Sequence, residues 1–142
     1  MLSQTVRSII GQQSLVTAAP STTVREAAEL MARKRVGAVV VVDGGGLVGI
    51  FSERDAVFRV VARGLEPTAT RLAQVMTPAP VSIGADRSYG HAMALMHEHQ
   101  CRHLPVVENG RPIGIVSARN ALDPELEDFV CEERRRRRFE AG

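Results

Sequence analysis

Large aromatic side chains are scarce in this 142-residue chain, which has no tryptophan, one tyrosine and four phenylalanines. Its core must therefore come mainly from aliphatic side chains, within an apolar fraction of 44% that is large enough to build one. Cysteine is also rare, and Cys101 and Cys131 are too few for a disulfide framework. We expect both thiols to be reduced, as is usual in the cytosol.

Long apolar runs are missing as well, and no segment approaches the roughly 20 residues that a membrane-spanning helix needs. The first eleven residues carry one arginine and a single apolar pair, Ile9-Ile10, which is too short for a secretory signal. Neither sign of charge dominates, because the net charge is +2. These absences predict a cytoplasmic globular protein with no membrane segment.

The chain repeats itself at an offset of 65 residues. Residues 16–57, aligned without a gap on residues 81–122, share twelve identities, against roughly three expected by chance. Gly49-Ile50, for example, falls on Gly114-Ile115. Two copies of one structural unit therefore follow each other along the chain.

Both copies predict the same order of elements, a β-α-β-β-α unit. In the first copy, an extended stretch over 15–17 precedes a helix that Thr23 caps, with Glu26 at the position that a capping box uses. Apolar strands over 37–42 and 47–51 then flank a glycine-rich turn, which is a hairpin pattern. The second helix of each copy is expected to begin near Glu53 and Ala118, and the extended stretch and strands of the second copy are expected at 80–83, 104–107 and 112–116.

Together, the copies predict an α/β (α+β) fold in which two β-α-β-β-α repeats pack sheet to sheet with pseudo-twofold symmetry. A half of about 55 residues buries its sheet poorly alone, whereas packing the sheets together buries both and leaves clefts between them. The segment 64–70, which contains Pro67, is the predicted linker. We therefore divide the chain into residues 1–64, residues 65–122 and a C-terminal amphipathic helix over 123–142.

This duplicated pattern resembles the tandem pair of cystathionine-β-synthase (CBS) domains, also called the Bateman module, of the stand-alone bacterial type. The resemblance covers about residues 5–122 and rests on the order and spacing of six short stretches. They are Thr23–Ala27, Gly37–Val42 and Gly49–Asp55 in the first copy, and Val75–Pro78, Arg102–Val107 and Gly114–Asn120 in the second. The resemblance implies a non-catalytic regulatory module with a site for an adenosyl ligand in each half.

The family's motif of glycine, a hydroxyl residue and aspartate falls on Gly49, Ser52 and Asp55. In the family, the aspartate holds the two ribose hydroxyls and the hydroxyl residue approaches phosphate. The residues support this role, because N–H groups at a helix start attract anions and a carboxylate offers two acceptors to a diol. Adenine is expected beside Gly37, where the absent side chain lets a ring approach the backbone. The other expected ligand contacts are Thr17, Thr23, Val36, Ala38, Arg54, Ser82, Arg102, His103, Leu104, Pro105, Ser117, Arg119 and Asn120.

The second copy departs from the motif, because Asn120 stands where aspartate is expected. An amide has one acceptor oxygen and no charge, and hydrogen bonds to charged groups are worth about 1.5–3 kcal/mol against about 1 for neutral ones. We therefore expect the Asn120 site to be weaker or to prefer another adenosyl ligand, with Arg102 and His103 as candidate contacts for a di- or triphosphate. For Ser52 and Asp55 the alternative is a plain helix cap.

The expected ligand is AMP, ADP or ATP, with NAD and S-adenosylmethionine as alternatives, and no catalytic cofactor is expected. We expect a homodimer that reports ligand state to an unidentified regulated protein. Catalysis finds no support, because no nucleophile–base pair, phosphate-binding loop or dinucleotide fingerprint is present. The alternatives are an interaction scaffold with empty clefts and a nucleic-acid-binding protein that uses the run Arg134–Arg138.

Two further patterns have competing interpretations. The residue types of His97, His99, Cys101 and His103 suit zinc, but His97 and His99 are two apart at a helix end and face different directions, so metal is not favoured. The arginine run follows a segment with a helix start at Asp123-Pro124-Glu125 and an apolar stripe. That pattern favours a terminal helix docked on the module or on a second subunit over nucleic-acid binding.

Overall fold

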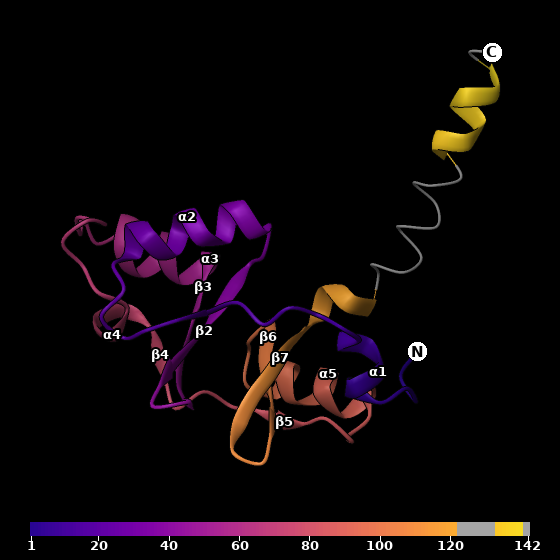
Figure 1. Cartoon of the computed structure of the whole chain (residues 1–142), viewed down its shortest axis with the longest axis horizontal. Coiled ribbons are helices and arrows are strands. Elements are labelled where there is room, and N and C mark those ends of the chain that lie inside the picture. Colours follow the sequence, from indigo (N-terminus) through magenta and orange to yellow (C-terminus); the bar gives the residue numbers. More distant parts are fainter. Residues whose placement is uncertain (122–132, 141–142) are drawn as a thin grey trace.

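The computed structural model describes residues 1–121 and 133–140 (Figure 1). Its helical elements are α1 (Val6–Ile10), α2 (Val24–Lys34), α3 (Glu53–Asp55), the π-helical η1 (Ala56–Val61), α4 (Leu72–Val75), α5 (Tyr89–Glu98) and the 3-10 helix η2 (Ala118–Ala121), with a further helix over 133–140. Its strands are β1 (Thr17–Ala18), β2 (Ala38–Asp43), β3 (Gly46–Ser52), β4 (Thr77–Pro78), β5 (Ile83–Gly84), β6 (His103–Glu108) and β7 (Arg111–Ser117).

The two repeats form two sheets that match the predicted offset. The first sheet has the order β1-β2-β3-β4 and the second the order β5-β6-β7. In each sheet a parallel pair is followed by an antiparallel hairpin, and Ala38 pairs with Ser52 as His103 pairs with Ser117. The hairpins even share a register shift at the same place, between Val41 and Val42 and again 65 residues later. The predicted duplicated α/β architecture is confirmed.

Local sequence signals set the helix starts. The Thr23 hydroxyl caps α2 by accepting from the Glu26 N–H at 3.2 Å, and Ser88 caps α5 by accepting from the His91 N–H at 3.1 Å. After each hairpin a helix begins where expected, at Glu53 and at Ala118. The first of these helices changes to π geometry after one turn, which the sequence did not indicate.

The cores do not follow the division of the chain at residue 64. Helix α1 buries Val6 and Ile10 among residues of the second half, around Tyr89. Helix α4 buries Leu72 and Val75 in the first core, and β4 extends the first sheet by pairing with β3. Each half therefore completes its core with a short helix from the segment that precedes the other repeat. The repeat boundaries themselves stay a prediction.

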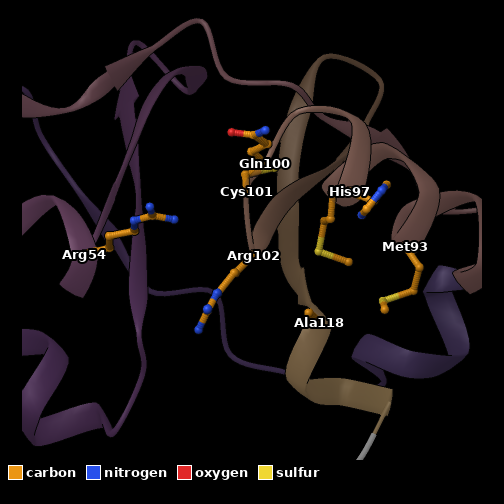
Figure 2. A pocket seen from close by; sticks show the side chains of 8 residues that line it. Arg54, Met93, His97, Gln100, Cys101, Arg102 and Ala118 are labelled. Atoms are coloured by element: carbon orange, nitrogen blue, oxygen red, sulfur yellow. The ribbon is translucent and has the colours of Figure 1, made fainter.

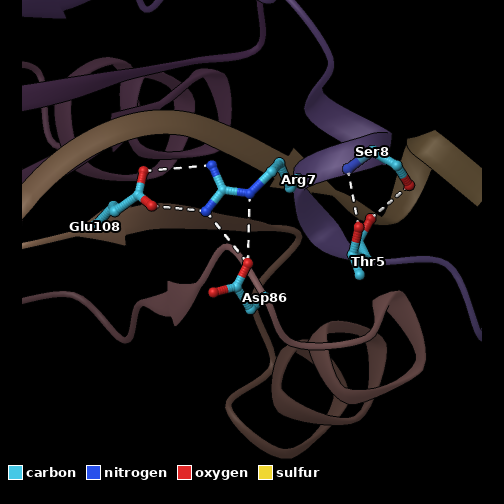
Figure 3. A network of polar contacts seen from close by, with 5 residues as sticks. All are labelled: Thr5, Arg7, Ser8, Asp86 and Glu108. Carbon is cyan, nitrogen blue, oxygen red and sulfur yellow. Dashed lines mark hydrogen bonds and ion pairs between the residues drawn. The ribbon is translucent and has the colours of Figure 1, made fainter.

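Helix α1 is held on the second half by polar contacts as well as by packing. Figure 3 shows the Arg7 guanidinium between two carboxylates, with Nη2 2.6 Å from Glu108 Oε1 and 3.3 Å from Asp86 Oδ1. The same helix begins at Thr5, whose hydroxyl accepts from the Ser8 N–H. The Val6 and Arg7 N–H groups donate to the backbone carbonyls of residues 87 and 85. The following segment, 11–16, then crosses back to the first half, where β1 begins.

The predicted C-terminal helix is described only over 133–140. Its expected start at Asp123 and its apolar stripe lie outside the described residues. Within 134–140 every side chain is exposed, and Phe139 is 86% exposed. Among the residues that the structure describes, no helix is long and apolar enough to cross a membrane.

Candidate functional site

A cavity of about 470 Å³ lies between the two halves, within the size range of small-molecule sites. We call it the seam cavity. Its walls come from the segment that follows α1, the end of α2 and start of β2, and the ends of β6 and β7 in the second half. The lining residues are Gln13, Ser14, Leu15, Val16, Arg35, Val36, Gly37, Ala38, Glu53, Arg102, His103, Ile115, Ser117, Ala118, Arg119 and Asn120.

Gly37 provides a bare stretch of backbone on one wall. A Cβ atom at this position would lie 3.1 Å from Glu53 Oε1 and 3.3 Å from His103 Nε2, so even alanine would be a tight fit. The backbone here is fixed, because the Gly37 carbonyl accepts from the Glu53 N–H at 2.9 Å. The adjoining Val36 and Ala38 make this wall largely apolar, which suits the flat face of a base.

The opposite wall carries Ser117 and Asn120, which form a closed hydrogen-bonded pair. Asn120 Oδ1 accepts from the Ser117 N–H at 2.7 Å and from its hydroxyl at 3.2 Å. No described hydrogen bond uses the amide nitrogen of Asn120. The carbonyl side of the amide is thus engaged in the helix cap, and the N–H₂ side is available to a ligand.

Three arginines line the seam cavity from both halves. Arg35 ends α2 in the left-handed conformation at φ 55°, Arg102 precedes β6, and Arg119 lies in η2. Within the part of the chain that the structure describes, none of the three forms an ion pair. Only one carboxylate, that of Glu53, lines the same cavity. The electrostatics of the cavity therefore favour an anion.

His103 lies where the two halves meet and is largely buried. Burial lowers the pKa of its imidazole below the ordinary value, and Arg102 and Arg119 lower it further. The carboxylates of Glu53 and Asp55 oppose this shift by raising the same pKa. Since burial is the largest of these effects, His103 is neutral at pH 7 and adds no charge to the cavity.

Ser52 and Asp55, the complete copy of the expected motif, line neither the seam cavity nor the second cavity described below. They form a capping box, in which Asp55 Oδ2 accepts from the Ser52 N–H at 3.0 Å and from its hydroxyl at 3.1 Å. The other oxygen, Oδ1, lies 3.5 Å from Arg59 Nε. Both carboxylate oxygens thus already have partners within their own half.

A second cavity of about 420 Å³ opens on the other side of the seam (Figure 2). Arg54 extends toward it from the first half, and its guanidinium lies 5.1 Å from the centre of the Phe58 ring. Relative to the seam cavity, the 65-residue offset replaces Gly37 with Arg102 and Arg35 with Gln100. The remaining lining residues are Met93, Met96, His97, Cys101 and Ala118.

The structure groups the predicted contacts differently from the sequence. Gly37 and its neighbours were expected to act with Ser52 and Asp55, but the seam cavity brings them together with Ser117, Arg119 and Asn120 of the other repeat. The physical reason is that the sheets pack face to face, so the start of one hairpin faces the end of the other. Predicted contacts that line neither cavity, besides Ser52 and Asp55, are Thr17, Thr23, Ser82, Leu104 and Pro105.

Several cavity residues escaped the sequence analysis. Arg35 and Glu53 flank predicted contacts and could have been found from their position beside Val36 and Ser52. The segment 13–16 belongs to no recognised motif, and only the docking of α1 on the second half brings it to the cavity. Among the described residues, no group of three His, Cys, Asp or Glu side chains is arranged to hold a metal ion.

Comparison with known proteins identifies the sequence pattern. The sequence model of the CBS domain matches residues 6–62 and 72–124. The "Meiotically up-regulated gene 70 protein" of Schizosaccharomyces pombe is 41% identical over 128 residues, which are 82% of this chain but only 16% of that protein. The chain thus spans about a sixth of the length of this relative.

Solved structures share the fold. A protein of Burkholderia ambifaria with CBS domains, which has been described as a signal-transduction protein, is 35% identical, with a TM-score of 0.80 over 88% of this chain and 96% of that chain. The CBS domain protein PAE2072 of Pyrobaculum aerophilum, solved in complex with AMP, is 26% identical, with a TM-score of 0.75 over 82% of this chain and 89% of that one.

Proposed function

Since this chain belongs to the CBS-domain family and carries the domain twice, as a regulatory module, we propose that it binds an adenine nucleotide in the seam cavity. The observation that carries the proposal is the cavity itself, whose bare wall at Gly37 lies opposite a wall with unpaired arginines. The relative that was solved with AMP supports the choice of adenine nucleotides. NAD and S-adenosylmethionine remain alternatives without such support.

In this proposal the base lies against the backbone of 36–38, and the phosphates lie among the arginines. A ligand held in this way touches both halves and the crossing segment 13–16 at once. It therefore favours the arrangement of the halves that lets all these groups reach it, and it shifts the equilibrium by its difference in affinity between arrangements. The cleft beside Ser52 and Asp55 is a secondary candidate, because both carboxylate oxygens are engaged and Arg102 takes the place of a glycine.

The rest of the proposed function is regulatory. We infer a non-catalytic cytoplasmic homodimer that reports nucleotide state to another protein. Support for self-association comes from η1, which exposes Val57, Phe58 and Val61 to solvent at 52%, 55% and 70%. Neighbouring apolar side chains at such exposure are typical of an interaction surface.

Isothermal titration calorimetry on the full chain with AMP, ADP and ATP tests the site. Replacing Gly37 by valine should abolish binding, because its side chain would occupy the space beside Glu53 and His103. In the unmodified protein, a nucleotide at 100 times its Kd should stabilise the fold by about 2.7 kcal/mol, which a thermal shift would detect.

The matched control is Gly46→Val at the start of β3, where the added Cβ meets only the Asp43 carbonyl at an ordinary 3.6 Å. This variant should bind like the unmodified chain. If Gly37→Val folds and still binds with unchanged affinity, the ligand lies elsewhere. If no adenine nucleotide binds the unmodified chain, the scaffold interpretation replaces the sensor.

A further inference from the structure

The polar side chains of the seam cavity offer mainly hydrogen-bond donors. Gln13 Oε1 accepts from the Ile115 N–H at 2.8 Å, just as Asn120 Oδ1 accepts from the backbone and hydroxyl of Ser117. Both amides therefore have their acceptor side turned to the protein. What they can present to a ligand is the N–H₂ side, which only donates.

The charged groups of the cavity have the same bias. Arg35, Arg102 and Arg119 are donors only, and none has a carboxylate partner among the described residues. Glu53 is the single carboxylate on the lining, and the neutral His103 supplies no charge. Phosphate oxygens would find many partners here, whereas the hydroxyls of an unmodified ribose would find few.

The contrast with the other repeat locates this preference at one position. Asp55 and Asn120 are 65 residues apart and cap equivalent strand ends in the same way, each accepting from the N–H and the hydroxyl of a serine three residues earlier. The cap therefore works with either residue. What changes is the group beside it, which is a negative oxygen in one repeat and an N–H₂ donor in the other.

We propose that the seam cavity selects adenine nucleotides with at least two phosphate groups, and that Asn120 is the residue that sets this specificity. The inference rests on the proposed function and adds the chemical class of the ligand. The amide of Asn120, beside Arg119, donates to a phosphate that an aspartate would repel. The second phosphate can belong to the 5′ chain or to the ribose, since both offer the same oxygens.

Calorimetric titrations of the full chain in magnesium-free buffer with AMP, ADP and adenosine 3′,5′-bisphosphate test the inference. At least one of the two bisphosphorylated ligands should bind about tenfold or more tightly than AMP, the effect of one added charge-assisted hydrogen bond. The tighter of the two identifies where the second phosphate lies. Equal affinity for all three would overturn the inference but leave the proposed function intact, whereas absence of all binding would overturn both.

The variant Asn120→Asp tests the assigned residue. It should keep its cap on Ser117 and fold normally, but the advantage of the bisphosphorylated ligand over AMP should fall below about threefold. The matched control is Asn109→Asp, the same chemical change at the chain's other asparagine, in the β6–β7 turn and outside the cavity. An unchanged preference in Asn120→Asp, or an equal loss in Asn109→Asp, would refute the role of Asn120.

A second variant tests the charge independently of Asn120. Arg35→Gln installs the residue found at the equivalent position of the second repeat, Gln100. It should weaken binding of the bisphosphorylated ligand about tenfold or more while changing AMP binding less. An equal loss for both ligands would mean that the arginine supports the cavity without reading the phosphate number.

Discussion

His103 is the residue through which the two halves influence each other electrostatically. It opens β6 in the second half, yet its Nε2 atom lies next to Gly37 of the first half. The groups that act on its pKa come from both halves: Glu53 and Asp55 on one side, Arg102 and Arg119 on the other. A proton added here would therefore change the field of the seam cavity directly.

Acidification should strengthen phosphate binding relative to a variant without the imidazole. Because burial holds the pKa of His103 below its ordinary value, the side chain is neutral at pH 7.5 and gains its charge only as the pH falls through that lowered pKa. The ratio of ADP affinities, unmodified chain over His103→Gln, should rise between pH 7.5 and pH 5.5 in calorimetric titrations. A flat ratio would contradict the placement of His103 at the phosphates.

The same shift affects the stability of the free protein. A histidine kept neutral in the fold but free to protonate when unfolded stabilises the fold fully above its unfolded pKa of about 6.5, and this contribution is lost as the pH falls toward the lowered folded pKa. His103→Gln should therefore remove part of the decline in stability on acidification. Urea denaturation at several pH values would measure the difference.

Among the secondary-structure elements, η1 has the least settled surroundings. Its buried residue is Val60, and Arg59 donates to the carbonyls of Val75 and Met76, so one side of the helix is fixed to the first core. The other side is the exposed apolar face of Val57, Phe58 and Val61. At the 65-residue offset, Val57 and Val61 coincide with Leu122 and Leu126, so the apolar pair is duplicated in the sequence.

Charging this face should prevent self-association. Val61→Asp adds a carboxylate to a side chain that is 70% exposed, so the fold should be retained while burial of the face against a second copy becomes unfavourable. Light scattering coupled to size exclusion should then report a monomer, and circular dichroism an unchanged fold. Phe139→Asp, on the exposed C-terminal helix, is the control and should remain dimeric; a dimeric Val61→Asp would place the interface elsewhere.

Local elements were largely predictable, and their partners were not. The hairpins at 38–52 and 103–117 and the caps at Thr23 and Ser52 depend on neighbouring residues, so turn and capping signals reveal them. The pairing of β4 with β3 and the insertion of α1 into the second core depend on residues far apart in the sequence. The composition of the cavity depends on the same long-range packing, so the motif alone assigned Gly37 to the wrong neighbours.

Considered as a whole, the molecule is tied together by two short helices that have exchanged places. Helix α1 packs in the second core and α4 in the first, while a β-bridge fastens each of these segments to the start of the neighbouring long helix. Neither core is complete without a segment that the repeat pattern would give to the other half. The two halves should therefore unfold together.

Truncating α1 in the second core tests this coupling. Ile10→Ala should lower the free energy of unfolding by about 2–5 kcal/mol, the usual cost of such a deletion in a core. The loss should appear in urea denaturation as a shift of one cooperative transition. Ile9→Ala, at the partly buried neighbouring position, should cost less. A separate early transition in Ile10→Ala would show instead that the second half melts independently.

The exchange of helices also changes what the linker around Pro67 is needed for. In a chain of two self-contained beads, that stretch would be the only tether, and severing it would release them. Here each bead still grips a piece of the other after such a cut, much as the protomers of an intertwined dimer do. Covalent continuity at the linker is thus a convenience of synthesis, and mutual possession of α1 and α4 is what keeps the nucleotide-sized gap between the beads in existence.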